Sequence, residues 1–126
     1  MKRNRVEGAK VAVTLGNDGI IRLVWNWHVR IEAIDAHAAM AAVDELADGR
    51  EYPMLVDMTS TASLSRQARS VFSSRCAASR IALVGSSPVD RILANWVLSG
   101  QKLPCPKRFF NSDAEATTWL RADPGW

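Results

Sequence analysis

Short apolar runs alternate with segments of helical period along this chain, and this alternation restricts the fold more than any other feature. Two arms of a hairpin come first, over residues 10–30, and the turn-forming sequence GNDG joins them. Three further apolar runs follow, at residues 52–58, 80–86 and 106–111, and helical spacing separates them. The predicted order is ββαβαβαβα. Strands that alternate with helices form mainly parallel sheets, so we expect one α/β domain with an antiparallel N-terminal hairpin.

Residues with a preference for helix starts precede the predicted helices. Asp35 is the expected N-cap of the first helix, and the second is predicted over residues 64–78. Ser87 precedes a proline at the first position of the third helix, and Asn111 or Ser112 caps the last. These caps support the predicted alternation independently of the apolar periodicity.

The predicted topology leaves part of the sheet in need of cover. If the parallel strands lie in sequential order, every crossover helix falls on one face, and the opposite face is poorly covered. The second hairpin arm places Trp25 and Trp27 on one side, and residues 89–98 form a helix that is apolar almost all round. Either the chain's own helices cover these surfaces, or another molecule does. The candidate interface or apolar-ligand residues are Trp25, Trp27, Ile92, Leu93, Trp96 and Val97.

Composition excludes several classes of protein. The chain has 126 residues, enough for one domain over residues 1–126 with a substantial core. Its two cysteines, Cys76 and Cys105, have neither the number nor the spacing of a disulfide framework or a zinc site. No apolar stretch reaches the length of a membrane span, and no secretory signal is present, so we expect a cytoplasmic protein. Residues 1–9 are expected to form a flexible basic arm.

Charge is unevenly distributed around a net value of +3. Residues 31–51 carry six acidic side chains and one basic, whereas residues 52–110 carry eight basic and two acidic. This pattern is typical of helix faces solvated by different signs, and it also allows a basic docking face for an acidic partner. The arginines of the N-terminal hairpin lack interleaved aromatic residues on the same face, which argues against nucleic acid as a partner.

Three stretches resemble one known family. "MLVDMTS" at residues 54–60, "SRIALVGSSPVDRILANWVL" at residues 79–98 and "PKRFFNSDAEATTWL" at residues 106–120 resemble small STAS-like proteins. These are relatives of bacterial anti-sigma-factor antagonists and, more distantly in fold, of CRAL-TRIO lipid carriers. The resemblance implies a mixed sheet with helices packed on it, and a cytoplasmic regulatory or binding role.

Members of that family switch by phosphorylation of a serine in an Asp-Ser-Ser-Gly-like motif. Counted from Asp57, the motif's Asp falls on Ser65 and its two serines fall on Arg66 and Gln67, with no glycine after them. The phosphoacceptor of the family is therefore not preserved at its position. Ser63 and Ser65 lie close to it.

The hydroxyl-rich segments after two of the predicted strands have two readings. They supply turns and helix caps, or they bind a phosphate or another small anion at the carboxyl edge of the sheet, where helix N-termini attract negative charge. Capping accounts for most of the composition. The candidate anion or phosphorylation residues are Ser63, Ser65, Arg66, Ser86, Ser87 and Arg91.

No motif of an enzyme is present. The chain has no Walker loop, no G-x-G-x-x-G and no nucleophile elbow, and His28 and His37 lack companions for a metal site. We expect no catalytic residue, no metal and no cofactor. The sequence favours a non-enzymatic STAS-like regulatory or protein-interaction module, with a protein partner or a second copy in a homodimer. The alternative is a small-molecule or lipid carrier with an apolar pocket between the sheet and residues 89–98.

Overall fold

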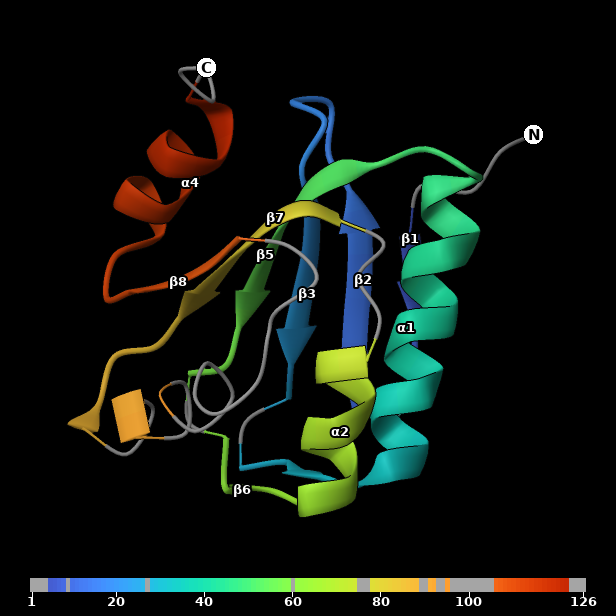
Figure 1. Ribbon diagram of the computed structural model, residues 1–126, viewed down its shortest axis with the longest axis vertical. Coiled ribbons are helices and arrows are strands. Elements are labelled where there is room, and N and C mark those ends of the chain that lie inside the picture. The colour runs from blue at the N-terminus through green and yellow to red at the C-terminus, as the bar shows by residue number, and fades with distance from the viewer. Residues whose placement is uncertain are drawn as a thin grey trace.

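The computed structural model describes residues 5–8, 10–26, 28–59, 61–74, 78–88, 91–92, 95 and 106–122. Within these residues the chain forms one six-stranded mixed sheet, a two-stranded parallel sheet, and helices on both faces of the larger sheet (Figure 1). The elements are, in order, β1 (Arg5–Glu7), β2 (Val11–Leu15), β3 (Ile21–Trp25), β4 (Arg30–Ile31), α1 (Ala33–Ala47), β5 (Tyr52–Asp57), β6 (Ser63–Leu64), α2 (Arg66–Ser74), β7 (Ala78–Val84), β8 (Lys107–Phe110) and α4 (Asp113–Arg121).

The larger sheet has the strand order β1-β2-β3-β5-β7-β8. The first three strands pair antiparallel, and β3, β5, β7 and β8 pair parallel. The predicted α/β class, with a mainly parallel sheet and an antiparallel hairpin, is therefore confirmed. The parallel strands lie in sequential order, as the prediction about crossovers assumed.

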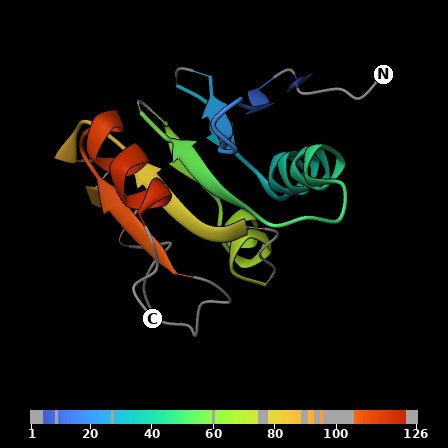
Figure 2. The same cartoon turned by 90° about the horizontal axis from the view of Figure 1, so that it is seen from above.

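The helices divide between the two faces of this sheet. Helices α1 and α2, from the first two crossovers, pack side by side on one face, and α4 lies on the other against β5, β7 and β8 (Figure 2). Among the described residues, the larger buried cluster fills the α1/α2 side and includes Leu23, Val43 and Leu46, each at most 1% exposed. A second, smaller cluster of described residues lies under α4. The sequence predicts that the face opposite the crossover helices is poorly covered; in the structure α4 covers the half of that face formed by β5, β7 and β8.

The second hairpin arm is shorter than its alternating pattern predicts. β3 ends at Trp25, and the Val29 N–H donates to the carbonyl oxygen of Asn26 at 3.2 Å in a turn where His28 has a φ of 57°. Asparagine and histidine tolerate this left-handed backbone better than most residues. The turn redirects the chain into β4, which pairs with β6 instead of with the larger sheet.

Helix α1 begins with a reciprocal cap. The structure moves the N-cap from Asp35, where the sequence predicts it, to Glu32; Asp35 is the third helical residue and accepts the Glu32 N–H at 2.9 Å. The two carboxylates form a capping box, which satisfies N–H groups at both positions. The helix ends as Asp48 and Gly49 adopt left-handed conformations, with φ values of 50° and 82°.

The prediction of a flexible arm over residues 1–9 is wrong for residues 5–7. Arg5, Val6 and Glu7 form strand β1, which pairs antiparallel with β2 in the register Val6↔Val13. A strand of three residues is too short for its periodicity to be recognised in sequence. The hydrogen bonds and apolar surface that β2 offers are what order it.

Candidate functional site

The chain leaving β5 is held against the end of β7. The Met58 N–H donates to the carbonyl oxygen of Val84 at 2.9 Å, which extends the ladder by one bond beyond the strands. The Asp57 carboxylate accepts the Thr59 N–H at 3.0 Å, in the local turn that an aspartate at a strand end commonly makes. Asp57 therefore acts in the turn, and this explains its position without a ligand.

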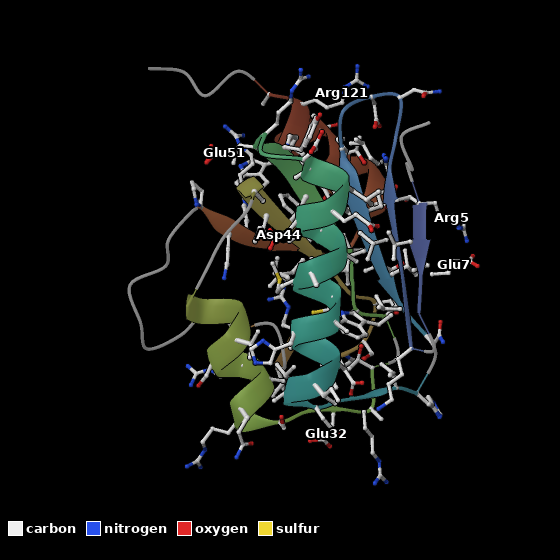
Figure 3. All side chains as sticks on the ribbon, turned by 90° about the vertical axis from the view of Figure 1, so that its right-hand side faces the viewer. Arg5, Glu7, Glu32, Asp44, Glu51 and Arg121 are labelled. Carbon is white, nitrogen blue, oxygen red and sulfur yellow. The ribbon has the colours of Figure 1, made fainter. Side chains whose placement is uncertain are left out.

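The following residues are drawn toward the start of α1. The Ala62 N–H donates to the carbonyl oxygen of Val29 at 2.8 Å, and the Ser65 N–H to that of Ile31 at 2.9 Å. Between them, β6 pairs with β4 in the register Arg30↔Ser63 and Ile31↔Leu64. The amino ends of α1 and α2 therefore lie side by side at one end of the molecule (Figures 1 and 3).

Ser65 is the N-cap of α2. Its hydroxyl oxygen accepts the Ala68 N–H at 3.0 Å, and its carbonyl oxygen accepts the Arg69 N–H at 3.0 Å. The capping role proposed for the hydroxyl-rich segment is correct at this residue. The hydroxyl is half-buried and used by the helix, whereas Ser63 and Arg66 on either side of it are exposed.

These residues define a surface that we call the α2 corner, made of Arg30, Ile34, Ser63, Ser65 and Arg66. The hydrogen bonds of β4–β6 fix its backbone, and Arg30, Ser63 and Arg66 present charge and a hydroxyl group to solvent. Ile34, in the first turn of α1, is 77% exposed, the highest value among the large apolar side chains of the described chain. The corner therefore combines exposed charge and a hydroxyl group with one exposed apolar side chain.

Sequence reasoning missed Ile34 and Arg30. Ile34 lies outside the apolar stripe of α1, whose buried members include Ala36, Met40 and Val43. An apolar residue out of phase with its helix is a recognisable signal. Arg30 carried no such signal, because its place beside Ser63 depends on a pairing across more than thirty residues.

A buried hydroxyl group lies at the base of the corner. Thr61 is 4% exposed, its N–H donates to the carbonyl oxygen of Met58 at 3.1 Å, and its Oγ1 atom has no hydrogen-bond partner among the residues that the structure describes. An unsatisfied buried hydroxyl group costs about 1–3 kcal/mol. Burial of the Thr61 hydroxyl group therefore lowers the stability of the fold.

The second hydroxyl-rich segment lies on a different part of the edge. The Gly85 N–H donates to the carbonyl oxygen of Phe110 at 3.1 Å, which draws this segment toward β8, away from β4 and β6. Ser86 is exposed, and the Ser87 carbonyl oxygen accepts the Arg91 N–H at 3.1 Å, as at a helix start. The Arg91 guanidinium group lies 5.3 Å from the centre of the Phe109 ring. The backbone bonds thus draw the two groups of candidate anion-binding residues apart.

One of the apolar candidates is covered by the chain itself. Trp25 is 4% exposed and belongs to the α1/α2 cluster, so it presents no surface to a partner; α1 and its neighbours cover this side of the hairpin. Ile92 is 65% exposed. The remaining candidates, together with most of the apolar helix and the pocket expected beside it, lie outside the described residues: Trp27, Leu93, Trp96 and Val97.

Ion pairs fix the elements around the α2 corner. Lys10 Nζ lies 2.9 Å from Asp35 Oδ2 and also donates to the carbonyl oxygen of Arg30 at 3.2 Å. Burial raises the pKa of Asp35, but the hydrogen bonds from the Glu32 N–H and from Lys10 outweigh it and hold the pKa below its usual value. Lys10 therefore ties β2, β4 and α1 together.

The described residues show little that suggests catalysis. In residues 5–122, outside the gaps given above, no three His, Cys, Asp or Glu side chains gather as they would around a metal ion. Burial lowers the pKa of Lys107 on β8. A shallow surface hollow of about 420 Å³ lies on the outer side of α4, around Trp119 and Thr118.

Among the parts of the chain that the structure describes, no helix is both long and apolar enough to cross a lipid bilayer.

The architecture defines a SpoIIAA-like α/β domain. A solved structure of an uncharacterised DUF3478-family protein with a SpoIIAA-like fold, from Shewanella loihica PV-4, matches it with a TM-score of 0.58 and 19% identity, covering 95% of this chain and 98% of that chain. This agrees with the resemblance to STAS-like proteins found in the sequence.

The chain belongs to the DUF7793 family, a domain of unknown function, which it matches over residues 14–122. A protein with unknown function from Arthrobacter sp. FB24 is 52% identical, over 92% of this chain and 97% of that chain, and its solved structure gives a TM-score of 0.38. That relation rests on sequence. No curated protein matches the chain.

Proposed function

We propose that this protein is a non-enzymatic regulatory module that acts by binding another protein through the α2 corner. The observation that carries the proposal is the exposed Ile34 side chain in the first turn of α1, which follows β4, while the pairing of β4 with β6 brings the exposed Arg30 and Arg66 to the same end of the molecule. Such a surface combines an apolar anchor with charges that select a partner.

The fold and the chemistry of the described residues support this reading. The Ser65 hydroxyl oxygen accepts the Ala68 N–H as the cap of α2, and one oxygen of the Asp57 carboxylate accepts the Thr59 N–H in the local turn. Neither is arranged with a base or a nucleophile as a catalytic group would be. Function is argued from the site, since a SpoIIAA-like fold by itself does not assign one.

The charge of the corner indicates the kind of partner. Arg30 and Arg66 are exposed, and the Glu32 carboxylate accepts the Asp35 N–H in the capping box of α1. The amino ends of two helices add positive potential at the same place. An acidic segment carrying an apolar side chain is the partner that fits. We propose that the protein binds this partner in the cytoplasm of a bacterium, as the resemblance to STAS-like regulators implies.

Site-specific crosslinking followed by titration tests the proposal. A photoreactive residue at position 34 should trap a partner in the producing cells, whereas the same residue at position 24, on the opposite face, should not. The trapped protein is then purified and titrated against the wild type, Ile34→Ser and Arg66→Glu. We expect each substitution to weaken binding at least tenfold, since a central anchor contributes about 2 kcal/mol or more.

Val24→Ser is the matched control. Val24 is 42% exposed, on the face of the sheet that α4 leaves open, so its loss removes a comparable apolar side chain from the surface. Its binding should stay within about threefold of the wild type, as for a residue outside the contact. Equal affinities for the wild type, Ile34→Ser and Arg66→Glu would refute the α2 corner as the docking site.

A further inference from the structure

Strand β1 is a terminal strand of the six-stranded sheet, and its charges face outward. Arg5 and Glu7 lie on the same side of the strand and form an ion pair with each other, with side chains 58% and 63% exposed. Both point away from the body of the molecule (Figure 3). Val6, between them, packs against the α1/α2 core.

The backbone of β1 is oriented for pairing with another strand. The Gly8 N–H donates to the carbonyl oxygen of Val11, so residues at even positions direct their N–H and C=O groups toward β2. In an antiparallel ladder these groups alternate in direction along the strand. The N–H and C=O groups of Arg5 and Glu7 therefore point to the outer edge, where a strand would be added.

From this arrangement we propose that the protein forms a twofold homodimer in which β1 pairs antiparallel with β1 of a second copy, centred on Val6. Only residues with outward N–H groups can exchange hydrogen bonds, and among the described residues of β1, Arg5 and Glu7 can do so in three registers. Two of them place Arg5 opposite Arg5 or Glu7 opposite Glu7. The third places Arg5 opposite Glu7 of the other copy, and by symmetry Glu7 opposite Arg5. Opposite charges on facing strand positions stabilise a pair and like charges destabilise it, so the strand selects the third register.

The other terminal strand lacks this self-complementarity. β8 carries Lys107 and Arg108 and no acidic residue, so any pairing of two β8 strands brings basic side chains together without compensation. Charged terminal strands generally discourage association. On β8 the charges have that effect, whereas on β1 they match those of a second copy.

Helix α1 lies where the dimer would extend its contact. It packs over β1 and β2, and a twofold axis perpendicular to the joined sheets places the two copies of α1 on the same face, on either side of the axis. Asp35 bonds Lys10 at the start of β2, so this side of α1 is turned toward the hairpin. Ala38 follows one turn later on that side and is exposed, and its small side chain allows a second helix to approach.

The inference deepens the self-association expected from the sequence, and it stands independently of the α2 corner, because β1 shares no residue with that surface. Charge reversal tests it. Untagged wild type should show twice the chain mass of 13.9 kDa by light scattering or native mass spectrometry. Arg5→Glu alone and Glu7→Arg alone each oppose like charges, and each should dissociate at least tenfold more readily. The double variant that exchanges the two charges should remain dimeric.

Mixing the two single variants provides the sharpest readout. An equimolar mixture of Arg5→Glu and Glu7→Arg restores both opposite pairs and should form a heterodimer that neither protein forms with itself. Arg108→Glu, a reversal on the other terminal strand, should leave the dimer unchanged. A wild type that is monomeric at about 100 µM, well above a micromolar dissociation constant, would overturn the proposal. So would single variants that remain dimeric, or a mixture that does not recombine.

Discussion

The two faces of the central sheet differ in how completely the chain covers them. On the α1/α2 face, most side chains of β2, β3, β5 and β7 are apolar and buried, and the buried ones range from Val13 at 0% exposed to Val11 at 8%. On the α4 face, only the half formed by β5, β7 and β8 is buried, through Leu55, Ala82 and Phe110. The central sheet is therefore covered across its α1/α2 face but over only half of its α4 face.

The residues of the open half explain the difference. Thr14, Arg22 and Ala12 are half-exposed there, and Val24 is 42% exposed. Arg22 bonds Asp18 across the end of the hairpin. Antiparallel strands tolerate water on one face, whereas the interior parallel strands need cover on both. The last helix thus covers the parallel half and leaves the hairpin half solvated.

Cavity-creating substitutions give the largest expected difference between the faces. Leu46 on α1 is 0% exposed and Leu120 on α4 is 4% exposed, so the same change can be made in each cluster. Leu46→Ala should lower the free energy of unfolding by about 3–5 kcal/mol, and Leu120→Ala by about 2–3 kcal/mol, because neighbours of a small terminal cluster close in more readily. Urea denaturation of the two variants measures both values. A Leu120→Ala cost equal to that of Leu46→Ala would mean that both faces contribute alike.

A smaller effect of the opposite sign is expected at Thr61, at the edge of the sealed face. Its Oγ1 atom is buried and has no partner in the described part of the chain, so Thr61→Val should raise the free energy of unfolding by about 1 kcal/mol. Thr61→Ser keeps the hydroxyl group and removes a methyl group, and it should lower stability by about 1 kcal/mol. The thermal midpoints of the three proteins report both changes. A destabilised Thr61→Val variant would show that the hydroxyl group has a partner in solution.

The smallest expected effect on stability concerns the Arg22–Asp18 ion pair, on the hairpin half of the α4 face, which α4 does not cover. The hydrogen bond from Arg22 lowers the pKa of Asp18, and the pair lies 2.9 Å apart with side chains about one-third exposed or less. A carboxylate whose pKa is lower in the folded state stabilises the protein above its unfolded pKa, and this stabilisation is lost as the pH falls below 3.8 through the folded value. Asp18→Asn should therefore cost about 0.5–1 kcal/mol at pH 7 and little in acid.

Urea denaturation across this pH range, at low and high salt, measures that contribution. Added salt should shrink the difference between Asp18→Asn and the wild type at pH 7, because exposed charges are screened. A difference that persists unchanged in acid would assign the effect to packing or to the backbone hydrogen bond at Ile20.

Local patterns in the sequence predicted most of the elements correctly. The turn at residues 16–19, the apolar strands and the caps at Ser65 and Ser112 each depend on neighbours a few residues away; the Ser112 hydroxyl oxygen accepts the Glu115 N–H at 3.3 Å. Helix α1 was found, although its cap moved from Asp35 to Glu32, because both carboxylates belong to the same reciprocal motif. Such features are visible in sequence because their energetics are local.

The candidate site was predictable only in part. The sequence indicated Ser65 as a cap and placed the hydroxyl-rich segments at the correct edge of the sheet. It did not predict that β4 and β6 pair, which sets Arg30 beside Ser63 and draws the segment away from Ser86 and Ser87. Two-residue strands have no periodicity, so only the packing of α1 against α2 brings them together.

By itself the sequence determined the order of the longer strands and of the helices between them, the mainly parallel pairing and the apolar side of those strands, since these follow from local periodicity and from the handedness of crossovers. Only the tertiary structure decided that α4 covers half of the second face, that Trp25 is buried in the α1/α2 cluster, and that Arg5–Glu7 joins the sheet as its terminal strand. Each of those outcomes depends on burying surface between residues distant in the chain, and no local pattern encodes which surfaces will meet.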